Sequence, residues 1–179
     1  MAVRDPAAPG SIRWWDRQGL RGGLFAGIVF ALIELLLMGA LDGQVEVARF
    51  LRRVAAMWIG PAALAPDYPF GIVAVVGSVM HLGLSAIFGL IFTWLTESIV
   101  PRLVRSPGIL LAMATVYGVL LWPLNVYLIA PFVGWEWFAH ETAPVVQAAA
   151  HLGYGAALGL YLYRRASRAI TRIQAVLET

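Results

Sequence analysis

The sequence predicts an all-α membrane protein with four transmembrane helices from two tandem, parallel two-helix repeats, plus one amphipathic interfacial helix. Three observations carry this prediction. Of the 179 residues, 60% are hydrophobic and 13% charged, which is too apolar for a domain with a water-facing surface. Four apolar stretches reach the roughly 20 residues that cross a hydrocarbon core of about 30 Å. The segment that begins at His81 recurs seventy positions later at His151.

The recurrence extends beyond the two histidines. His81-Leu82-Gly83 returns as His151-Leu152-Gly153, and the same offset pairs Pro61 with Pro131. Self-similarity at a fixed offset in a membrane protein indicates two halves related by a pseudo-two-fold axis. We therefore divide the chain into a cytoplasmic tail (1–19), repeat 1 (20–97), repeat 2 (98–165) and a cytoplasmic C-terminal tail (166–179).

Composition excludes several classes of site and partner. The chain has no cysteine, which excludes disulfides, thiolate metal sites, iron–sulfur clusters and covalent c-type haem. All 13 basic residues are arginine, and no basic patch is interleaved with aromatic residues, so no nucleic-acid partner is predicted. The expected partners are the lipid bilayer and either other membrane protein subunits or further copies of the chain.

Repeat 1 contains two predicted spans, 20–41 and 70–95, separated by an amphipathic segment. The first span carries one ionisable residue, Glu34. The segment 44–58 is typical of a helix that lies in the membrane interface, on its outer side. Its apolar face is predicted to hold Val47, Leu51, Val54 and Trp58, and its polar face Glu46, Arg49 and Arg53.

Repeat 2 begins with a polar turn and contains the spans 108–129 and 143–163, joined by an outer loop over 131–142. Within the third span, Pro123 predicts a kink, and Asn125 beside it is interpreted as mending the backbone there. Arginines next to the spans number four in the N-terminal tail, two between spans two and three and four after span four, against three on the other side. The positive-inside rule then places both termini in the cytoplasm.

The two histidines are candidate cofactor-binding residues. Both are expected near the membrane midplane, on helix stripes that also carry small residues, so His81 and His151 could face one another. In one interpretation the imidazoles are neutral and bond across the bundle to Asn125, Glu34, Tyr117 or each other. In another they are the axial ligands of a b-type haem held between spans two and four.

Glu34 is expected to have a structural or a functional role, because a carboxylate inside a span costs about 2.5–3.5 kcal/mol on insertion scales. It is interpreted either as a protonated or imidazole-bonded lock for the bundle, or as a functional group. With His81 and His151 it would make a set that holds a divalent metal or relays protons.

The pattern from His81 to Gly108, then Pro131 and His151-Leu152-Gly153-Tyr154-Gly155, resembles a group of small four-span bacterial inner-membrane proteins that includes the YagU type. The resemblance covers most of residues 20–165. It implies a four-span fold and a location in the bacterial inner membrane, and it brings no catalytic residue with it.

Nothing in the sequence predicts an enzyme, because it holds no nucleophile with a base in helical register, no phosphate-binding loop and no HExxH motif. The leading hypothesis is a non-enzymatic accessory or scaffolding subunit of a larger inner-membrane assembly, since spans rich in glycine and alanine offer packing surfaces. One alternative is a b-type haem electron-transfer subunit with His81 and His151 as ligands. A second is a small carrier or proton pathway that uses Glu34.

Overall fold

The computed structural model describes residues 12–42, 46–99, 106–141 and 143–177, and these residues form helices and short connections without a strand. Four helices are long and apolar enough to cross a membrane, as the sequence predicts: Trp14–Leu41, Phe70–Ser98, Pro107–Phe132 and Pro144–Arg168.

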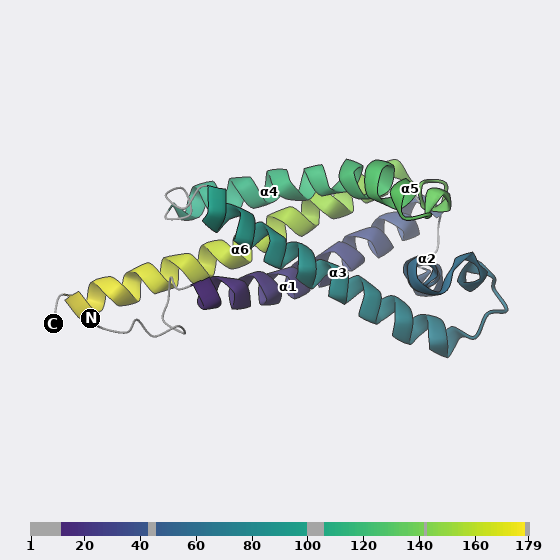
Figure 1. The fold of residues 1–179 in the computed structure, drawn as a ribbon, viewed down its shortest axis with the longest axis horizontal. Coiled ribbons are helices and arrows are strands. Elements are labelled where there is room, and N and C mark those ends of the chain that lie inside the picture. Colours follow the sequence, from purple (N-terminus) through teal and green to yellow (C-terminus); the bar gives the residue numbers. More distant parts are fainter. Residues whose placement is uncertain (1–11, 43–45, 100–105, 142, 178–179) are drawn as a thin grey trace.

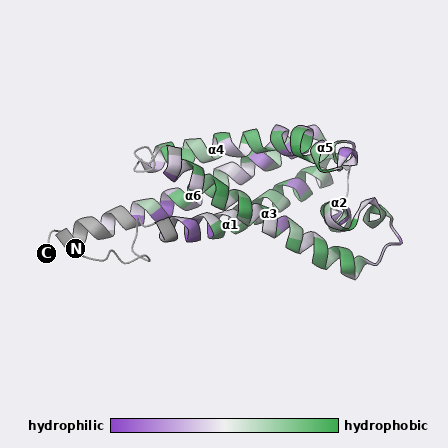
Figure 2. Cartoon of the chain, in the orientation of Figure 1, coloured by the Kyte–Doolittle hydropathy of each residue, from purple (hydrophilic) through white to green (hydrophobic). Residues whose placement is uncertain are grey.

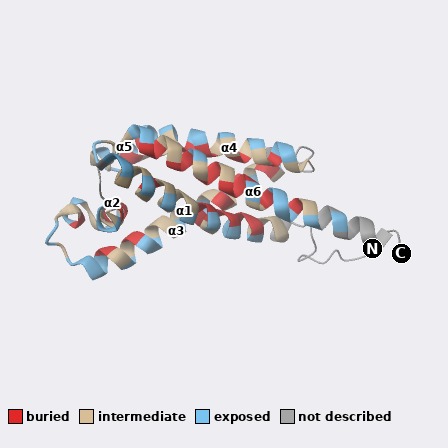
Figure 3. Ribbon diagram, turned by 180° about the vertical axis from the view of Figure 1, so that it is seen from behind, coloured by how far each residue is buried: buried red, intermediate tan, exposed pale blue. Residues whose placement is uncertain are grey.

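The four long helices form two hairpins that lie against each other: α1 (Ile12–Asp42) with α3 (Phe70–Ile99), and α4 (Pro107–Pro123) with α6 (Pro144–Leu177). The two hairpins meet mainly where α1 packs against α6. α1 and α4 run in one direction and α3 and α6 return, so α1 begins and α6 ends at the same end of the bundle (Figure 1). Hydrophobic residues follow the long helices, and the buried residues lie where the helices face one another (Figures 2 and 3).

Two helices extend beyond the predicted spans. α1 begins at Ile12, inside the predicted N-terminal tail, and α6 continues to Leu177, through the predicted C-terminal tail. The α6 extension over 166–177 contains no glycine or proline, and the α1 extension over 12–19 contains no proline and only one glycine, Gly19. The sequence of these extensions therefore offers no strong helix stop. Of the predicted turn between spans two and three, residues 100–105 lie outside the described part of the chain.

At Pro123, where the sequence predicts a kink, the structure changes from α-helix to π-helix. α4 ends at Pro123, and the chain continues as a π-helical segment, η3 (Leu124–Ile129), and the short helix α5 (Ala130–Phe132). The backbone N–H of Ala130 donates to the carbonyl of Asn125, five residues earlier. Proline removes a backbone donor, and a π-helical turn lets the neighbouring carbonyls find other donors.

Glycines bring the helices of each hairpin into backbone contact. Gly23 of α1 lies so close to α3 that a Cβ there would clash with the Ser85 carbonyl. Gly118 of α4 lies equally close to α6, and a Cβ there would stand 2.5 Å from the His151 carbonyl and 2.6 Å from the Gly155 Cα. Small residues at helix crossings let van der Waals contact replace the hydrophobic effect, which does not act between helices in lipid.

The amphipathic segment forms α2 (Val47–Ile59), followed by the 3-10 helix η1 (Pro61–Leu64). α2 packs against the first half of α3, at the end of the bundle away from the start of α1 (Figure 1). The helix is confirmed, but the predicted division of its faces is wrong. Arg53 is buried with Phe50 and Val54, whereas Trp58 is 75% exposed.

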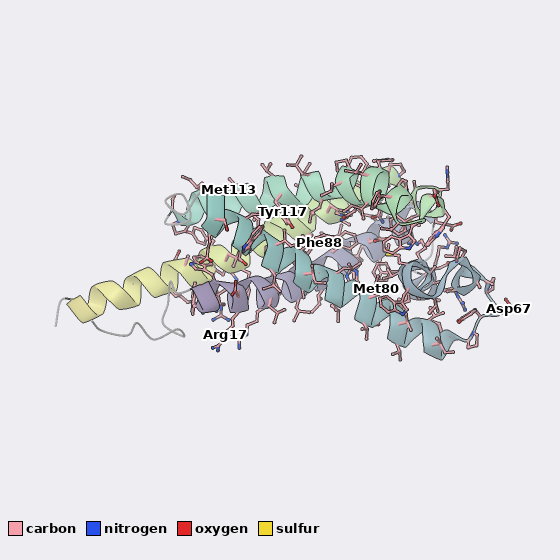
Figure 4. The ribbon with its side chains drawn as sticks, in the orientation of Figure 1. Arg17, Asp67, Met80, Phe88, Met113 and Tyr117 are labelled. Carbon is pink, nitrogen blue, oxygen red and sulfur yellow. The ribbon has the colours of Figure 1, made fainter. Side chains whose placement is uncertain are left out.

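Arg52 holds the loop between η1 and α3. Its guanidinium donates hydrogen bonds to four backbone carbonyls at 2.6–3.3 Å, those of Ala63, Ala65, Pro66 and Tyr68. Asp67 lies at the tip of this loop, and Arg17 lies toward the opposite end of the molecule (Figure 4). A planar guanidinium with five donors suits a cluster of carbonyls, so Arg52 fixes the position where α3 begins.

Two tyrosines of the second hairpin bond to the backbone of α3. The Tyr154 hydroxyl donates to the Ser85 carbonyl at 2.6 Å, and the Tyr117 hydroxyl donates to the Phe88 carbonyl at 3.0 Å. Phe88 and Tyr117 lie near the middle of the bundle (Figure 4). These bonds therefore tie the two hairpins together at Ser85 and Phe88 of α3.

We expect Tyr154→Phe to lower the free energy of unfolding by about 1 kcal/mol, because it removes one buried hydrogen bond and little volume. The measurement is a denaturant titration of the purified protein in mild detergent. Tyr127→Phe is the matched control, since Tyr127 is 54% exposed. Equal stability of the two variants would show that the Tyr154 bond contributes nothing to the contact between the hairpins.

Candidate intramembrane binding cavity

A cavity of about 190 Å³ lies between the two hairpins, beside α2. Its lining is mostly apolar, and every long helix contributes to it. The apolar lining includes Phe30, Phe50, Val54, Met57, Leu84, Phe88, Leu121, Val126 and Ile129. The polar lining comprises Glu34, Arg53, His81, Ser85, Asn125, Gln147, His151 and Tyr154, with Trp135 from the outer loop. All four of the polar residues singled out from the sequence, Glu34, His81, Asn125 and His151, therefore line one space.

A buried ion pair forms one wall of the cavity. Arg53 Nη2 lies 3.0 Å from Glu34 Oε1, and the two side chains are only 3% and 4% exposed. Arg53 Nη1 also donates to the Glu141 carbonyl at 3.2 Å, and the Gln147 side chain hydrogen bonds to Glu34. The pair thus joins α2 to α1, to α6 and to the loop before α6. Charges removed from water are tolerated only when they are paired and hydrogen-bonded in this way.

The partner of Glu34 is therefore Arg53, and the predicted imidazole bond to Glu34 is wrong. The sequence holds a signal for Arg53 that the predicted faces of α2 missed. Phe50, Arg53, Val54 and Met57 recur at i, i+3, i+4 and i+7, which puts Arg53 on an apolar stripe. An arginine on an apolar stripe and a lone glutamate in the preceding span favour a buried ion pair.

The two histidines come from different hairpins and bond to backbone carbonyls instead of the predicted side chains. The distance from His81 Nε2 to the Gly27 carbonyl of α1 is 2.8 Å, and so is that from His151 Nδ1 to the Gln147 carbonyl of its own helix. Each imidazole therefore carries its proton on the bonded nitrogen. His81 joins α3 to α1. This agrees with the interpretation in which the imidazoles form polar contacts between helices. His151, in contrast, bonds within α6.

The residues present do not fit a haem between the two imidazoles. The Phe30 ring packs against both of them, with ring centroids 5.5 Å from His81 and 4.9 Å from His151. A bis-histidine haem binds its iron through one ring nitrogen of each imidazole, so the macrocycle must lie between two imidazoles that here both contact the Phe30 ring. His81 Nε2 is also engaged with the Gly27 carbonyl. Both histidines contact Phe30 and so lie near each other, but they are not placed as the two ligands of one haem.

The proposed His, His and Glu metal set does not form either. Among the described residues, no group of three or more histidine, aspartate or glutamate side chains is placed to hold a metal ion. Glu34 is turned to Arg53, so a proton pathway through Glu34 would first require that pair to separate. The cavity could accept a small, mostly apolar molecule, with the polar side chains of its lining facing one part of that molecule.

The chain was also compared with protein-family models, curated proteins and solved structures, and no match was found in any of the three comparisons. The resemblance to small four-span bacterial membrane proteins accordingly remains a prediction.

Proposed function

We propose that the chain is a non-enzymatic accessory or scaffolding protein of a membrane, one that packs against helices of other subunits or of a second copy. The observation that carries the proposal is Gly83, in the middle of α3. A Cβ at Gly83 would meet no atom of the described chain within 4 Å, unlike one at Gly23 or Gly118.

Gly83 belongs to an outward-facing stripe of α3 with a spacing of four residues. The stripe consists of Gly71, Val75, Val79, Gly83 and Ile87, all of which are exposed. Glycine in the middle of a helix costs about 0.5–1 kcal/mol relative to alanine, and no close contact with the described residues offsets that cost at Gly83. A shallow surface of small and β-branched residues lets another transmembrane helix approach closely. We therefore assign this α3 stripe to contacts with a partner helix.

We further propose the internal duplication and the location in a bacterial inner membrane. The equivalent residues Gly89 and Gly159 support the duplication, because both lie where the second helix of a hairpin crosses the first. A Cβ at Gly89 would meet the backbone of Gly19 and Gly23, and one at Gly159 would meet Leu111 and Ala114. The parallel course of the two hairpins agrees with a tandem copy (Figure 1).

The contacts of the α2 arginines support the proposal that both termini lie in the cytoplasm. The three arginines of α2 are all engaged: Arg49 pairs with Glu46, Arg52 with loop carbonyls, and Arg53 with Glu34. The arginines at the α2 end of the bundle are therefore engaged in local contacts. Counting only the other arginines strengthens the excess of positive charge at the end where α1 begins and α6 ends. α2 then lies at the outer side of the membrane, with exposed Trp58 suited to the interface.

The test is the oligomeric state of Gly83→Leu in mild detergent. We expect the unsubstituted protein to purify as a complex with itself or with another membrane protein. Leucine at Gly83 should shift it to a monomer without loss of thermal stability, because its side chain fills only the partner's space. Ala112→Leu is the matched control on an exposed position of α4, and it should leave the complex intact. A monomeric unsubstituted protein, or equal loss of the complex in both variants, would contradict the proposal.

A further inference from the structure

Exposed arginines gather at the end of the bundle where α1 begins and α6 ends (Figures 1 and 4). The described part of the chain holds five of them there: Arg17, Arg21, Arg164, Arg165 and Arg168. None of the five forms an ion pair or a hydrogen bond with another described residue. Like charges at one end of a bundle repel one another, so an external anion would bind there favourably.

Two of these arginines flank a contact between α1 and α6. The Phe25 ring of α1 packs against the Tyr161 ring of α6, with the ring centroids 6.2 Å apart. Arg21 lies one helical turn before Phe25, and Arg165 lies one turn after Tyr161. Because α1 and α6 run in opposite directions, both steps lead toward the same end of the bundle. Arg21 and Arg165 therefore stand side by side at the junction of the two helices, which we call the α1–α6 seam.

Tyr161 holds one of the two guanidinium groups in place. Arg165 Cζ lies 5.2 Å from the centroid of the Tyr161 ring, and the Tyr161 hydroxyl donates to Gln18 Oε1 at 3.2 Å. Gln18 is itself buried. A cation–π contact orients a guanidinium without neutralising its charge. Arg165 thus keeps its positive charge, and the N–H groups at its edge stay available to an anion.

The carboxylates at this end lie on another side of α1. The charge of Asp16 interacts with that of Glu97 of α3. Asp16 also stands seven residues, or two turns, before Gly23, whose backbone contacts α3. Arg21 comes five residues after Asp16, which places it about 140° further round the helix. The acidic side chains therefore face α3 and leave the charge of the α1–α6 seam unbalanced.

An exposed apolar row continues from Arg21 along α1. Phe25, Ile28, Leu32 and Leu36 follow Arg21 at i+4, i+7, i+11 and i+15, and they are 44%, 53%, 54% and 66% exposed. This spacing keeps them on one face of the helix. A cationic position at the end of a span, followed by an apolar row, matches the headgroup and an acyl chain of one phospholipid. A free phosphate ion would use only the arginines.

We propose that the α1–α6 seam binds an anionic phospholipid, with its phosphate held by Arg21 and Arg165 and an acyl chain along the apolar row of α1. Guanidinium groups are well suited to phosphate, and basic positions between transmembrane helices are typical sites for anionic headgroups. A zwitterionic lipid carries its own ammonium group and would balance the seam less well. The seam shares no residue with the α3 stripe, so this inference and the proposed partner contact can fail independently.

The experiment is a lipid titration of the purified protein in mild detergent, followed by native mass spectrometry. Phosphatidylglycerol and phosphatidylcholine with identical acyl chains are compared. We expect the first phosphatidylglycerol to bind at least about fivefold more tightly than the first phosphatidylcholine. Glycerol 1-phosphate, which has the phosphate but no acyl chain, should not displace the bound lipid. Equal affinities for the two lipids, or displacement by glycerol 1-phosphate, would overturn the proposal.

Substitutions locate the bound lipid. Arg21→Gln and Arg165→Gln should each weaken binding of the first phosphatidylglycerol about fivefold, because each removes one cation next to the phosphate. Arg49→Gln is the matched control, since it removes an arginine that is 47% exposed at the other end of the bundle, and it should leave binding unchanged. Thermal unfolding checks that each variant is folded. Equal weakening in all three variants, or full affinity in either folded seam variant, would overturn the assignment.

Discussion

Arg53→Met is expected to lower the free energy of unfolding by about 3–5 kcal/mol. The variant leaves the Glu34 carboxylate buried without its cation, and an uncompensated buried charge is far more costly than a missing contact. It also frees the Glu141 carbonyl from its bond to Arg53. The measurement is a denaturant titration in mild detergent, followed by circular dichroism.

Arg49→Met is the matched control on the same helix. Arg49 pairs with Glu46 at 2.8 Å, but the two side chains are 47% and 41% exposed. Exposed ion pairs contribute about 0–1 kcal/mol, so this variant should be nearly as stable as the parent. A similar loss in both variants would mean that burial of the Arg53 pair does not govern the stability of this region.

Gly118→Ala is expected to cause a loss of about 3 kcal/mol, at the upper end of the usual cost of overpacking. The added methyl group would meet the backbone of His151 and Gly155, which cannot rotate out of its way as a side chain can. α4 and α6 would have to separate along their length. The loss should appear as a lower midpoint of thermal unfolding of the purified protein.

Gly83→Ala is the matched control, because it adds the same methyl group at a position where a Cβ has no described atom within 4 Å. In monomeric protein it should raise stability by about 0.5–1 kcal/mol, because alanine has the higher helix propensity. If both alanine variants behave alike, the close contact at Gly118 is not a constraint on the fold.

The fold could be predicted from the sequence because its signals are local. Long apolar runs identify the four helices, and polar residues with proline and glycine separate them. The ends of α1 and α6 could not be placed, since the bilayer sets the length of an apolar span but not where a helix stops. The change to a π-helix after Pro123 is also a matter of local backbone adjustment that proline signals only in general terms.

The candidate site was predicted only in part, because its key contacts join distant segments. Glu34 and both histidines could be identified as polar residues inside apolar spans. Their partners could not, since the Gly27 and Gln147 carbonyls belong to the backbone and leave no trace in residue identity. The sequence predicts Arg53 on the solvated face of α2 because a charged residue is usually exposed, whereas its burial depends on a carboxylate in another helix.

The buried pair between Glu34 and Arg53 holds α2 against the two hairpins and lines the cavity. A double-mutant cycle with Glu34→Met, Arg53→Met and the two together tests it most directly, with the free energy of unfolding as the measured quantity. The double variant is expected to be more stable than either single variant, because it leaves no unpaired buried charge. Losses that simply add in the double variant would contradict it.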